Sequence, residues 1–334
     1  MKNVKSHIVE VARLAQLKGL TSATGGNISV KMPKDTILIT RSGSSFSFLK
    51  EEDLLLLDTN GNIIEGKGHP SSEIALHLSA HKAFKDLNAV FHAHPTASLS
   101  LIERGFRIFP INFEARLMMG HGPILTAKTA IMSDPLDILN VLSYSNYCLL
   151  AKHGIVTIGK TLEEAYLLAE LIEESAKSTV CMISIDKTFK ESLKASMKEE
   201  VFWLTPFSCP LFGKIHLKEL VFKIEKEKLN IQEAVTGFPP ISVLFEVDEV
   251  ADNPPRRLWV YMGKDDVRIM GAEQKPIHDI AVKASFPVME AIFSGKTTLF
   301  CSYAHSRVIL SGEPISELLP YEAVLTRFFE SITK

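Results

Sequence analysis

Residues 69–95, HPSSEIALHLSAHKAFKDLNAVFHAHP, constrain this 334-residue chain more than any other stretch of its sequence. The stretch ends in His92-Ala93-His94, which lies on a short apolar segment typical of a β-strand. Because side chains two residues apart point to the same face of a strand, the two imidazoles project side by side. Imidazole is a common zinc ligand, so this segment predicts half of a metal site.

Two further residues are expected to complete this metal site. Glu73 lies at the start of the helix before the strand, where a tight helix–strand pairing brings its carboxylate alongside. His153, in CLLAKHGIVTIG, lies at a predicted turn between two β-rich runs. Three neutral imidazoles and one carboxylate suit zinc, which acts as a Lewis acid without redox chemistry.

A rival metal site lies on the helix itself, where Glu73, His77 and His81 follow one another at four-residue spacing. Side chains with this spacing share one face of a helix. We rank the helical set lower, because the first set draws its ligands from separate elements, as buried sites usually do. For His77 and His81 we therefore expect a solvated or capping role.

Three short turns near these residues predict an anion site. They are residues 24–27 (TGGN), residues 41–44 (RSGS), and the pair Ser71-Ser72 at the start of the predicted helix. Each offers backbone N–H groups, an amide or hydroxyls as donors, and a helix N-terminus adds positive dipole character. For TGGN alone, a plain helix-to-strand turn is the preferred interpretation.

Composition narrows the class of protein. Hydrophobic residues make up 46%, which is ordinary for a globular chain, and the net charge of −2 with no Lys/Arg run predicts no nucleic-acid partner. No apolar run reaches the roughly 20 residues that a membrane span requires, and the first residues do not resemble a signal peptide. The four cysteines lack paired spacing, so we expect reduced thiols in a cytoplasmic protein.

A change in composition divides the chain into two predicted domains. Residues 1–190 mix strands and helices, which predicts an α/β domain with a sheet flanked by helices. Residues 191–211, highly charged and then rich in Pro and Gly, form the predicted linker. Residues 212–334 predict an α+β domain with an antiparallel sheet, including a strand at 297–305 (TTLFCSYAH) and a terminal helix at 315–332.

The first domain resembles the class II aldolase/adducin family. The motifs TGGNIS, TRSGSS, PSSE, HAHP and KHGIVTIGKTLEEA occur in the family's order and spacing over residues 1 to about 185. The resemblance implies a central, mainly antiparallel sheet with helices on both sides. It also implies a homotetramer with its active site between neighbouring subunits.

The same resemblance implies roles for individual residues. His92, His94 and His153 would bind Zn²⁺ or another divalent metal, and Glu73 would be the catalytic acid that binds the metal or moves a proton. The positions that match the family's phosphate site are Asn27, Ser42, Gly43, Ser71 and Ser72. Together they predict a zinc-dependent lyase that cleaves a small phosphorylated ketose, leaving an enediolate whose charge the metal stabilises.

The sequence departs from the family pattern at two positions. Phe113 lies near the place where the aldolases have a proton-donating tyrosine, and His69 precedes PSSE where many relatives have lysine. A sugar-phosphate epimerase, dehydratase or decarboxylase using the same site is therefore an alternative. An alternative of another class is a non-catalytic scaffold or lipid-binding protein, but the adducin branch lacks the metal histidines that this chain retains.

The second domain more faintly resembles the sterol-carrier-protein-2-like (SCP2-like) fold. The resemblance depends on residues 279–325, read as a strand, a helix ending in Ser-Gly-Lys, two strands and a final helix. Members of that fold bind apolar molecules in a tunnel or serve as packing domains. We expect this domain to fold independently and to take no part in the chemistry.

Overall fold

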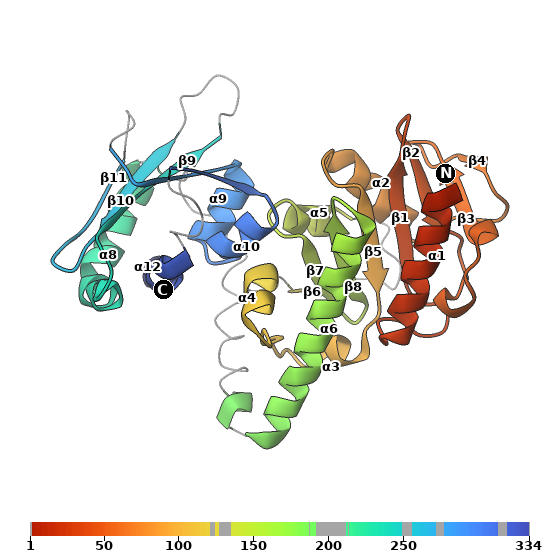
Figure 1. Ribbon diagram of the computed structural model, residues 1–334, viewed down its shortest axis with the longest axis horizontal. Helices are drawn as coiled ribbons and strands as arrows, with labels where there is room; N and C mark the ends of the chain where they lie inside the picture. Colours follow the sequence, from red (N-terminus) through yellow and green to blue (C-terminus); the bar gives the residue numbers. More distant parts are fainter. Residues whose placement is uncertain are drawn as a thin grey trace. The chain divides into compact units, whose positions relative to one another are not determined.

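The chain forms two compact units, Met1–Glu199 (unit 1) and Glu200–Lys334 (unit 2), which Figure 1 colours from red to green and from green to blue. The computed structural model describes residues 2–120, 124–126, 135–186, 188–191, 212, 214–248, 256–271, 277–312 and 319–333. The predicted linker, residues 191–211, lies outside the described residues except for its first residue. Within the described ranges, no helix is long and apolar enough to cross a membrane.

Unit 1 is built on an eight-stranded sheet in the order β4-β3-β2-β1-β5-β8-β7-β6. Neighbouring strands are antiparallel except β6 and β7, which are parallel. The strands are β1 (Asn27–Met32), β2 (Thr36–Thr40), β3 (Leu54–Leu57), β4 (Ile63–Glu65), β5 (Ala89–Ala93), β6 (Ile124–Thr126), β7 (Tyr147–Ala151) and β8 (Gly154–Gly159).

Helices cover both faces of this sheet, so the predicted α/β fold with a mainly antiparallel sheet is confirmed (Figure 1). The helices of unit 1 are α1 (Lys2–Leu17), η1 (Phe46–Phe48), η2 (Glu51–Asp53), α2 (Ile74–Ala83), α3 (Thr96–Glu103), α4 (Phe113–Met119), α5 (Leu136–Leu142) and α6 (Leu162–Ile185).

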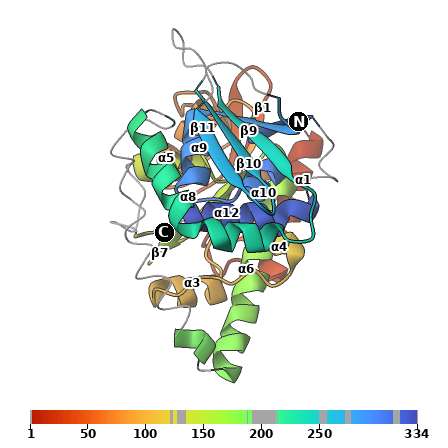
Figure 2. The same cartoon turned by 90° about the vertical axis from the view of Figure 1, so that its left-hand side faces the viewer.

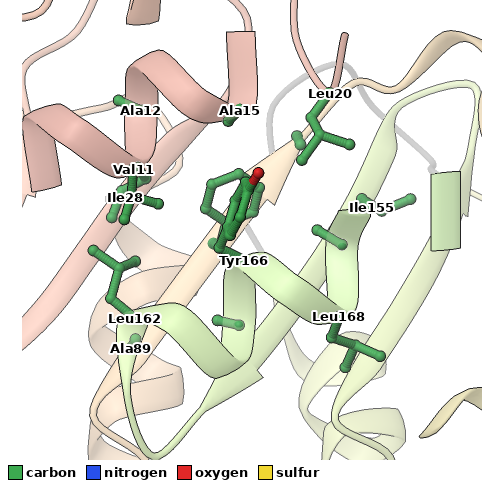
Figure 3. Close-up of a cluster of buried hydrophobic side chains, with 14 of the residues drawn as sticks. Val11, Ala12, Ala15, Leu20, Ile28, Ala89, Ile155, Leu162, Tyr166 and Leu168 are labelled. Atoms are coloured by element: carbon green, nitrogen blue, oxygen red, sulfur yellow. The ribbon is translucent and has the colours of Figure 1, made fainter. Parts of the chain in front are cut away.

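The two faces of β5 pack against different helices. Phe91 belongs to the apolar cluster formed with α1 and α6, which Figure 3 shows around Tyr166. Val90 belongs to a second cluster, formed with α2 and α5. Because strand side chains alternate, His92 and His94 follow Val90 to the face that α2 covers. Full burial of each large apolar side chain contributes roughly 1.5–3 kcal/mol, which fixes this arrangement of layers.

Unit 2 contains a five-stranded sheet in the order β11-β10-β9-β12-β13. Its strands are β9 (Ile241–Val247), β10 (Arg257–Met262), β11 (Val267–Gly271), β12 (Ile280–Ala284) and β13 (Val308–Gly312). Its helices are α8 (Lys214–Val235), α9 (Phe286–Phe293), α10 (Leu299–Ala304), η4 (Leu319–Tyr321) and α12 (Glu322–Thr333). Helices α8 and α12 pack side by side, as Figure 2 shows.

The α+β class of unit 2 agrees with the prediction, but three details differ. The pair β9–β12 is parallel, so the sheet is not wholly antiparallel. The strand predicted at 297–305 is wrong, because residues 299–304 form helix α10. The Thr298 hydroxyl accepts a hydrogen bond from the Cys301 N–H at 3.1 Å and caps this helix. The predicted terminal helix begins only at Glu322, while residues 313–318 lie outside the described ranges.

Candidate active site

The candidate site forms where β5 ends between β1 and β8. His92 pairs with Asn27 on β1 and with Val156 on β8. His153 lies in the tight turn between β7 and β8, where its N–H donates to the Leu150 carbonyl at 3.0 Å. The sheet therefore gathers residues that are widely separated in the sequence.

The three histidines predicted as metal ligands meet at this point. Their ligand nitrogens all lie within 4.8 Å of one another. The Nε2 atom of His92 is 2.8 Å from Nε2 of His94 and 3.2 Å from Nε2 of His153. Glu73, immediately before α2, places Oε2 3.1 Å from His92 Nε2 and Oε1 2.8 Å from His153 Nε2.

The donor set fits a divalent cation. Nδ1 of His92 donates to the Ile155 carbonyl at 2.8 Å, which leaves the lone pair of the neutral ring on Nε2, among the other ligand atoms. Burial lowers the pKa of His92 to about 4 and also lowers the pKa of His94, so both rings are neutral near pH 7. Lone pairs of this kind beside a carboxylate repel one another unless a cation lies between them.

Glu73 is ionised in this setting. Burial alone would raise the pKa of its carboxyl group, but hydrogen bonds from His153 and from the Asn27 amide hold that pKa well below its usual range. A buried carboxylate of this kind adds negative charge to the histidine cluster, which again favours a bound cation.

Glycines allow the close approach that the histidine cluster requires. A Cβ atom on Gly154 would lie 2.3 Å from the Ala93 carbonyl oxygen and 2.6 Å from Cδ2 of His94. A Cβ atom on Gly25 would lie 2.7 Å from Nδ1 of His94. The TGGN turn thus packs against a metal-candidate ring, a role that consecutive glycines after a helix could have indicated.

A pocket opens beside the histidines and is lined by the predicted turns. Its walls contain all five predicted phosphate-site residues together with Glu73, His94 and His153. The RSGS and PSSE segments meet there, because Arg41 forms a β-bridge with Pro70 and the Ser42 N–H donates to the His69 carbonyl at 2.9 Å. Sequence reasoning did not select Arg41, which also lines the pocket and pairs with Asp53 at 2.5 Å.

Asn27 lies at the edge of the pocket, but its amide is engaged on both sides. Its Nδ2 donates to Glu73 Oε2 at 2.7 Å, and its Oδ1 lies 2.5 Å from His77 Nε2. The sequence predicts that this amide faces an anion. In the structure it contacts the Glu73 carboxylate, which the sequence pattern does not indicate.

The expected solvated or capping role of His77 and His81 is wrong, because the two residues are 0% and 5% exposed. Both rings point to the Ser29 hydroxyl on β1, since α2 packs directly over the sheet. Among the described residues, the possible metal set consists of His92, His94 and His153, without the helical rival.

Comparisons with known proteins agree with this geometry. The family model described as Class II Aldolase and Adducin N-terminal domain matches residues 6–180, more than half of the chain. An L-fuculose phosphate aldolase from Methanocaldococcus jannaschii is 33% identical over 189 residues, which cover 55% of this chain and 99% of that protein. A 5-methylthioribulose-1-phosphate/5-deoxyribulose-1-phosphate aldolase from Rhodospirillum rubrum is 32% identical over 174 residues, covering 51% and 77%.

A solved structure extends this likeness to three dimensions. The L-fuculose-1-phosphate aldolase from Thermus thermophilus matches with 30% identity and a TM-score of 0.50, covering 55% of this chain and 95% of that one. The family model ends at residue 180, so it describes unit 1 and not unit 2. The chain therefore belongs to the class II aldolase and adducin family, and it is a lyase of the class II aldolase type.

Proposed function

We propose that this lyase cleaves a small phosphorylated ketose between C3 and C4, in a zinc-dependent aldol cleavage. One observation carries the proposal: a cluster of three histidines and a carboxylate adjoins a pocket walled by serine- and glycine-rich turns. The relatives named as L-fuculose phosphate and 5-deoxyribulose-1-phosphate aldolases support a substrate of this class.

In this proposal His92, His94 and His153 hold the metal ion. A bound divalent cation supplies Lewis-acid stabilisation of the negative charge that develops on substrate oxygens as the carbon–carbon bond breaks. The three nitrogen ligands and the adjoining carboxylate favour zinc among the common cations. The Ile155 carbonyl fixes the ring of His92 in the tautomer that this role requires.

Glu73 moves the proton in this mechanism. Its Oε2 accepts the Asn27 amide, so Oε1 is the oxygen that exchanges a proton with the substrate. Glu73 lines the pocket and is 4% exposed, so its carboxylate has little contact with bulk water.

The phosphate group is placed at the turns, where Ser42, Gly43, Ser71 and Ser72 offer neutral donors. The ten-residue helix α2 begins directly after this segment, and its N-terminus favours an anion. We leave Asn27 at the edge of the phosphate site, because its amide already bonds Glu73 and His77. Holding the phosphate fixes the reacting carbons beside Glu73 and the histidines.

The test compares metal content and cleavage in one preparation. Cleavage of a ketose 1-phosphate between C3 and C4 releases dihydroxyacetone phosphate, which a coupled dehydrogenase reports as loss of NADH absorbance. We expect the purified full chain to contain one zinc per chain and to cleave L-fuculose 1-phosphate or 5-deoxyribulose 1-phosphate. A zinc-loaded protein that releases no dihydroxyacetone phosphate from a panel of ketose 1-phosphates would contradict aldol cleavage.

A second reaction at the same site is favoured by one observation. Phe113, at the start of α4, is 58% exposed and carries no proton donor at the place where the aldolases have a tyrosine. Dehydration or decarboxylation of a sugar phosphate, or an epimerisation that breaks no carbon–carbon bond, forms no aldehyde whose oxygen that donor would protonate. NMR of the products distinguishes these reactions from aldol cleavage. An epimer, a dehydrated ketose or a decarboxylated sugar retains the C3–C4 bond, whereas aldol cleavage gives two separate fragments.

For unit 2 we propose an SCP2-like, non-catalytic domain. The succession of β12, α9, β13 and α12 around one sheet supports this likeness, whereas α10 departs from the expected pattern. Binding of a fluorescent fatty acid to the full chain, lost on shortening the terminal helix, is the expected result. A scaffold without catalysis is less well supported, because a cluster of three histidines and a carboxylate, with His92 and Glu73 buried, is costly without a metal.

We also propose a cytoplasmic homotetramer. Exposed apolar side chains at Phe109, Ile111 and Phe113 support an interface on this segment of unit 1. The buried thiols of Cys148 and Cys301 suit a reducing compartment. Light scattering of the purified chain tests the tetramer, and a monomer at micromolar concentration would contradict it.

A further inference from the structure

A row of buried polar side chains leads away from the active-site carboxylate. It passes from Glu73 through Asn27, His77 and Ser29 to His81, and joins α2 to β1. None of these five residues exposes more than 7% of its surface. Buried polar groups are costly unless each has a hydrogen-bond partner, so such a row needs an explanation.

The contacts along this row are short and continuous. Asn27 Nδ2 donates to Glu73 Oε2 at 2.7 Å, and Asn27 Oδ1 lies 2.5 Å from Nε2 of His77. The other ring nitrogen of His77, Nδ1, lies 2.6 Å from the Ser29 hydroxyl. That hydroxyl also lies 2.8 Å from Nε2 of His81.

The carboxylate fixes the direction of every hydrogen bond in the row. A carboxylate only accepts, so the Asn27 NH₂ group must face Glu73 and its carbonyl must face His77. His77 then carries its proton on Nε2 and accepts at Nδ1, where Ser29 donates its O–H. The Ser29 oxygen in turn receives the N–H of His81 Nε2. Every donor therefore points toward Glu73.

The ring of His77 is neutral, as this direction requires, because it must donate at Nε2 and accept at Nδ1. Burial lowers the pKa of His77 to about 3. Burial and the nearby Lys31 lower the pKa of His81 to about 4, although the Leu87 carbonyl acts in the opposite sense. A neutral ring has one donor and one acceptor, which matches the two contacts of His77 without a surplus.

We propose that His77 is a positioning residue of the active site, which holds the Asn27 amide in the one orientation that donates to Glu73. Without the His77 N–H, the amide can turn over and present its carbonyl to the carboxylate. The Glu73 side chain would then be repelled from the place where Oε1 meets the substrate. Ser29 and His81 hold His77 in the required tautomer.

This inference rests on the proposed function, because it orients the group that moves the proton. The activity test uses the full-length, metal-loaded chain. His77→Leu removes the donor, and we expect kcat to fall about 10–100-fold, the usual effect of losing such a supporting partner. KM should change less than about threefold, because the phosphate turns are untouched.

A conservative variant separates this role from plain packing. In His77→Gln the side-chain NH₂ reaches the position of Nε2, so kcat should return to within about threefold of the parent. Ser29→Ala removes the donor to Nδ1 and should lower kcat several-fold, which keeps the test open if His77→Leu does not fold. The matched control is Thr179→Val, which removes a buried hydroxyl that accepts the Phe109 N–H, far along the sequence from the row.

NMR gives a readout that does not depend on activity. In protein labelled with ¹⁵N-histidine, we expect His77 and His81 as neutral Nε2–H tautomers, and His77 should keep that form from pH 5 to 8. A His77 proton on Nδ1, or full kcat in both His77→Leu and Ser29→Ala, would overturn the inference. A parent protein that cleaves no sugar phosphate would instead refute the proposed function, while the tautomer would still test the row.

Discussion

Two groups of histidines lie on either side of Asn27, and each contains a fully buried ring, His92 in one and His77 in the other. The groups differ in the partners of their ring nitrogens. His92, His94 and His153 direct ring nitrogens at one another, without enough protons to join them by hydrogen bonds. His77 and His81 direct theirs at Ser29 and Asn27, where each nitrogen of His77 has a partner. Sequence spacing describes both groups as metal candidates. The difference teaches that the partners of the ring nitrogens, rather than burial, separate a metal ligand from a supporting histidine.

The largest effect should come from removing the metal-candidate group. We expect the double variant His92→Ala, His94→Ala to lose all bound zinc and all measurable cleavage, because two of three nitrogen ligands are gone. Elemental analysis and the coupled assay measure both quantities. If this variant keeps its zinc while His77→Ala loses it, the metal binds to the helical set of Glu73, His77 and His81. The assignment of His92, His94 and His153 as ligands would then be wrong.

A charge in the pocket wall should act on substrate binding alone. Ser71→Asp puts a carboxylate among the phosphate donors, and repulsion of this kind should raise KM about 100-fold. Zinc content should not change, because no histidine is touched. Ser100→Asp on the exposed side of α3 is the control. An equal KM in both variants would mean that the phosphate does not bind near Ser71.

The supporting group should affect stability more than metal binding. His81→Phe leaves the Ser29 hydroxyl without its donor, and we expect the free energy of unfolding to fall by about 1–3 kcal/mol. Zinc content should stay at the parent's level. Urea denaturation and elemental analysis of the same samples check this, and loss of zinc would place His81 among the ligands.

The pH dependence of stability sharpens the comparison further. The pKa of His81 is about 4 in the folded chain and near 6.5 when unfolded, so the unfolded state binds the extra proton. Its contribution is therefore complete above pH 6.5 and is lost as pH falls toward 4, by up to about 1.4 kcal/mol per pH unit. Urea titrations at several pH values should show a shallower decline for His81→Phe. Parallel curves would mean that His81 is already charged in the folded state.

The smallest effect should come from removing unit 2. We expect residues 1–205 alone to bind zinc and to cleave the substrate with unchanged kcat, because every residue of the candidate site lies in unit 1. A soluble, zinc-loaded but inactive fragment would show that unit 2 completes the site.

Local patterns in the sequence predicted much of unit 1. The alternation in His92-Ala93-His94 placed two imidazoles on one face, and the His153-Gly154 turn was recognised between two strands. The histidine cluster could be anticipated because each of its members lies within one residue of the end or the start of a strand. The parallel pairs β6–β7 and β9–β12 depend on the path of the chain between distant strands. The hydrophobic periodicity of each segment carries no information about that path.

The remaining features depend on contacts between distant residues. The burial of His77 follows from α2 packing over Ser29, which is 48 residues away along the chain. From the sequence alone, the Asn27 amide could contact either a bound anion or a carboxylate. The position of Glu73 in the structure shows that it contacts the carboxylate. In unit 2, apolar residues 299–301 suit a strand as well as a helix, and the Thr298 cap favours the helix.

Strand β1 connects catalysis to the alignment of the sheet. Ile28 packs in the apolar cluster with α1 and α6, whereas Asn27 and Ser29 on either side of it face α2. A slip of one residue between β1 and β5 would push the amide and the hydroxyl into that cluster and turn Ile28 toward Glu73. A chain with this slip would therefore lose stability and catalysis together, so catalytic activity reports that β1 and β5 are paired in the correct register.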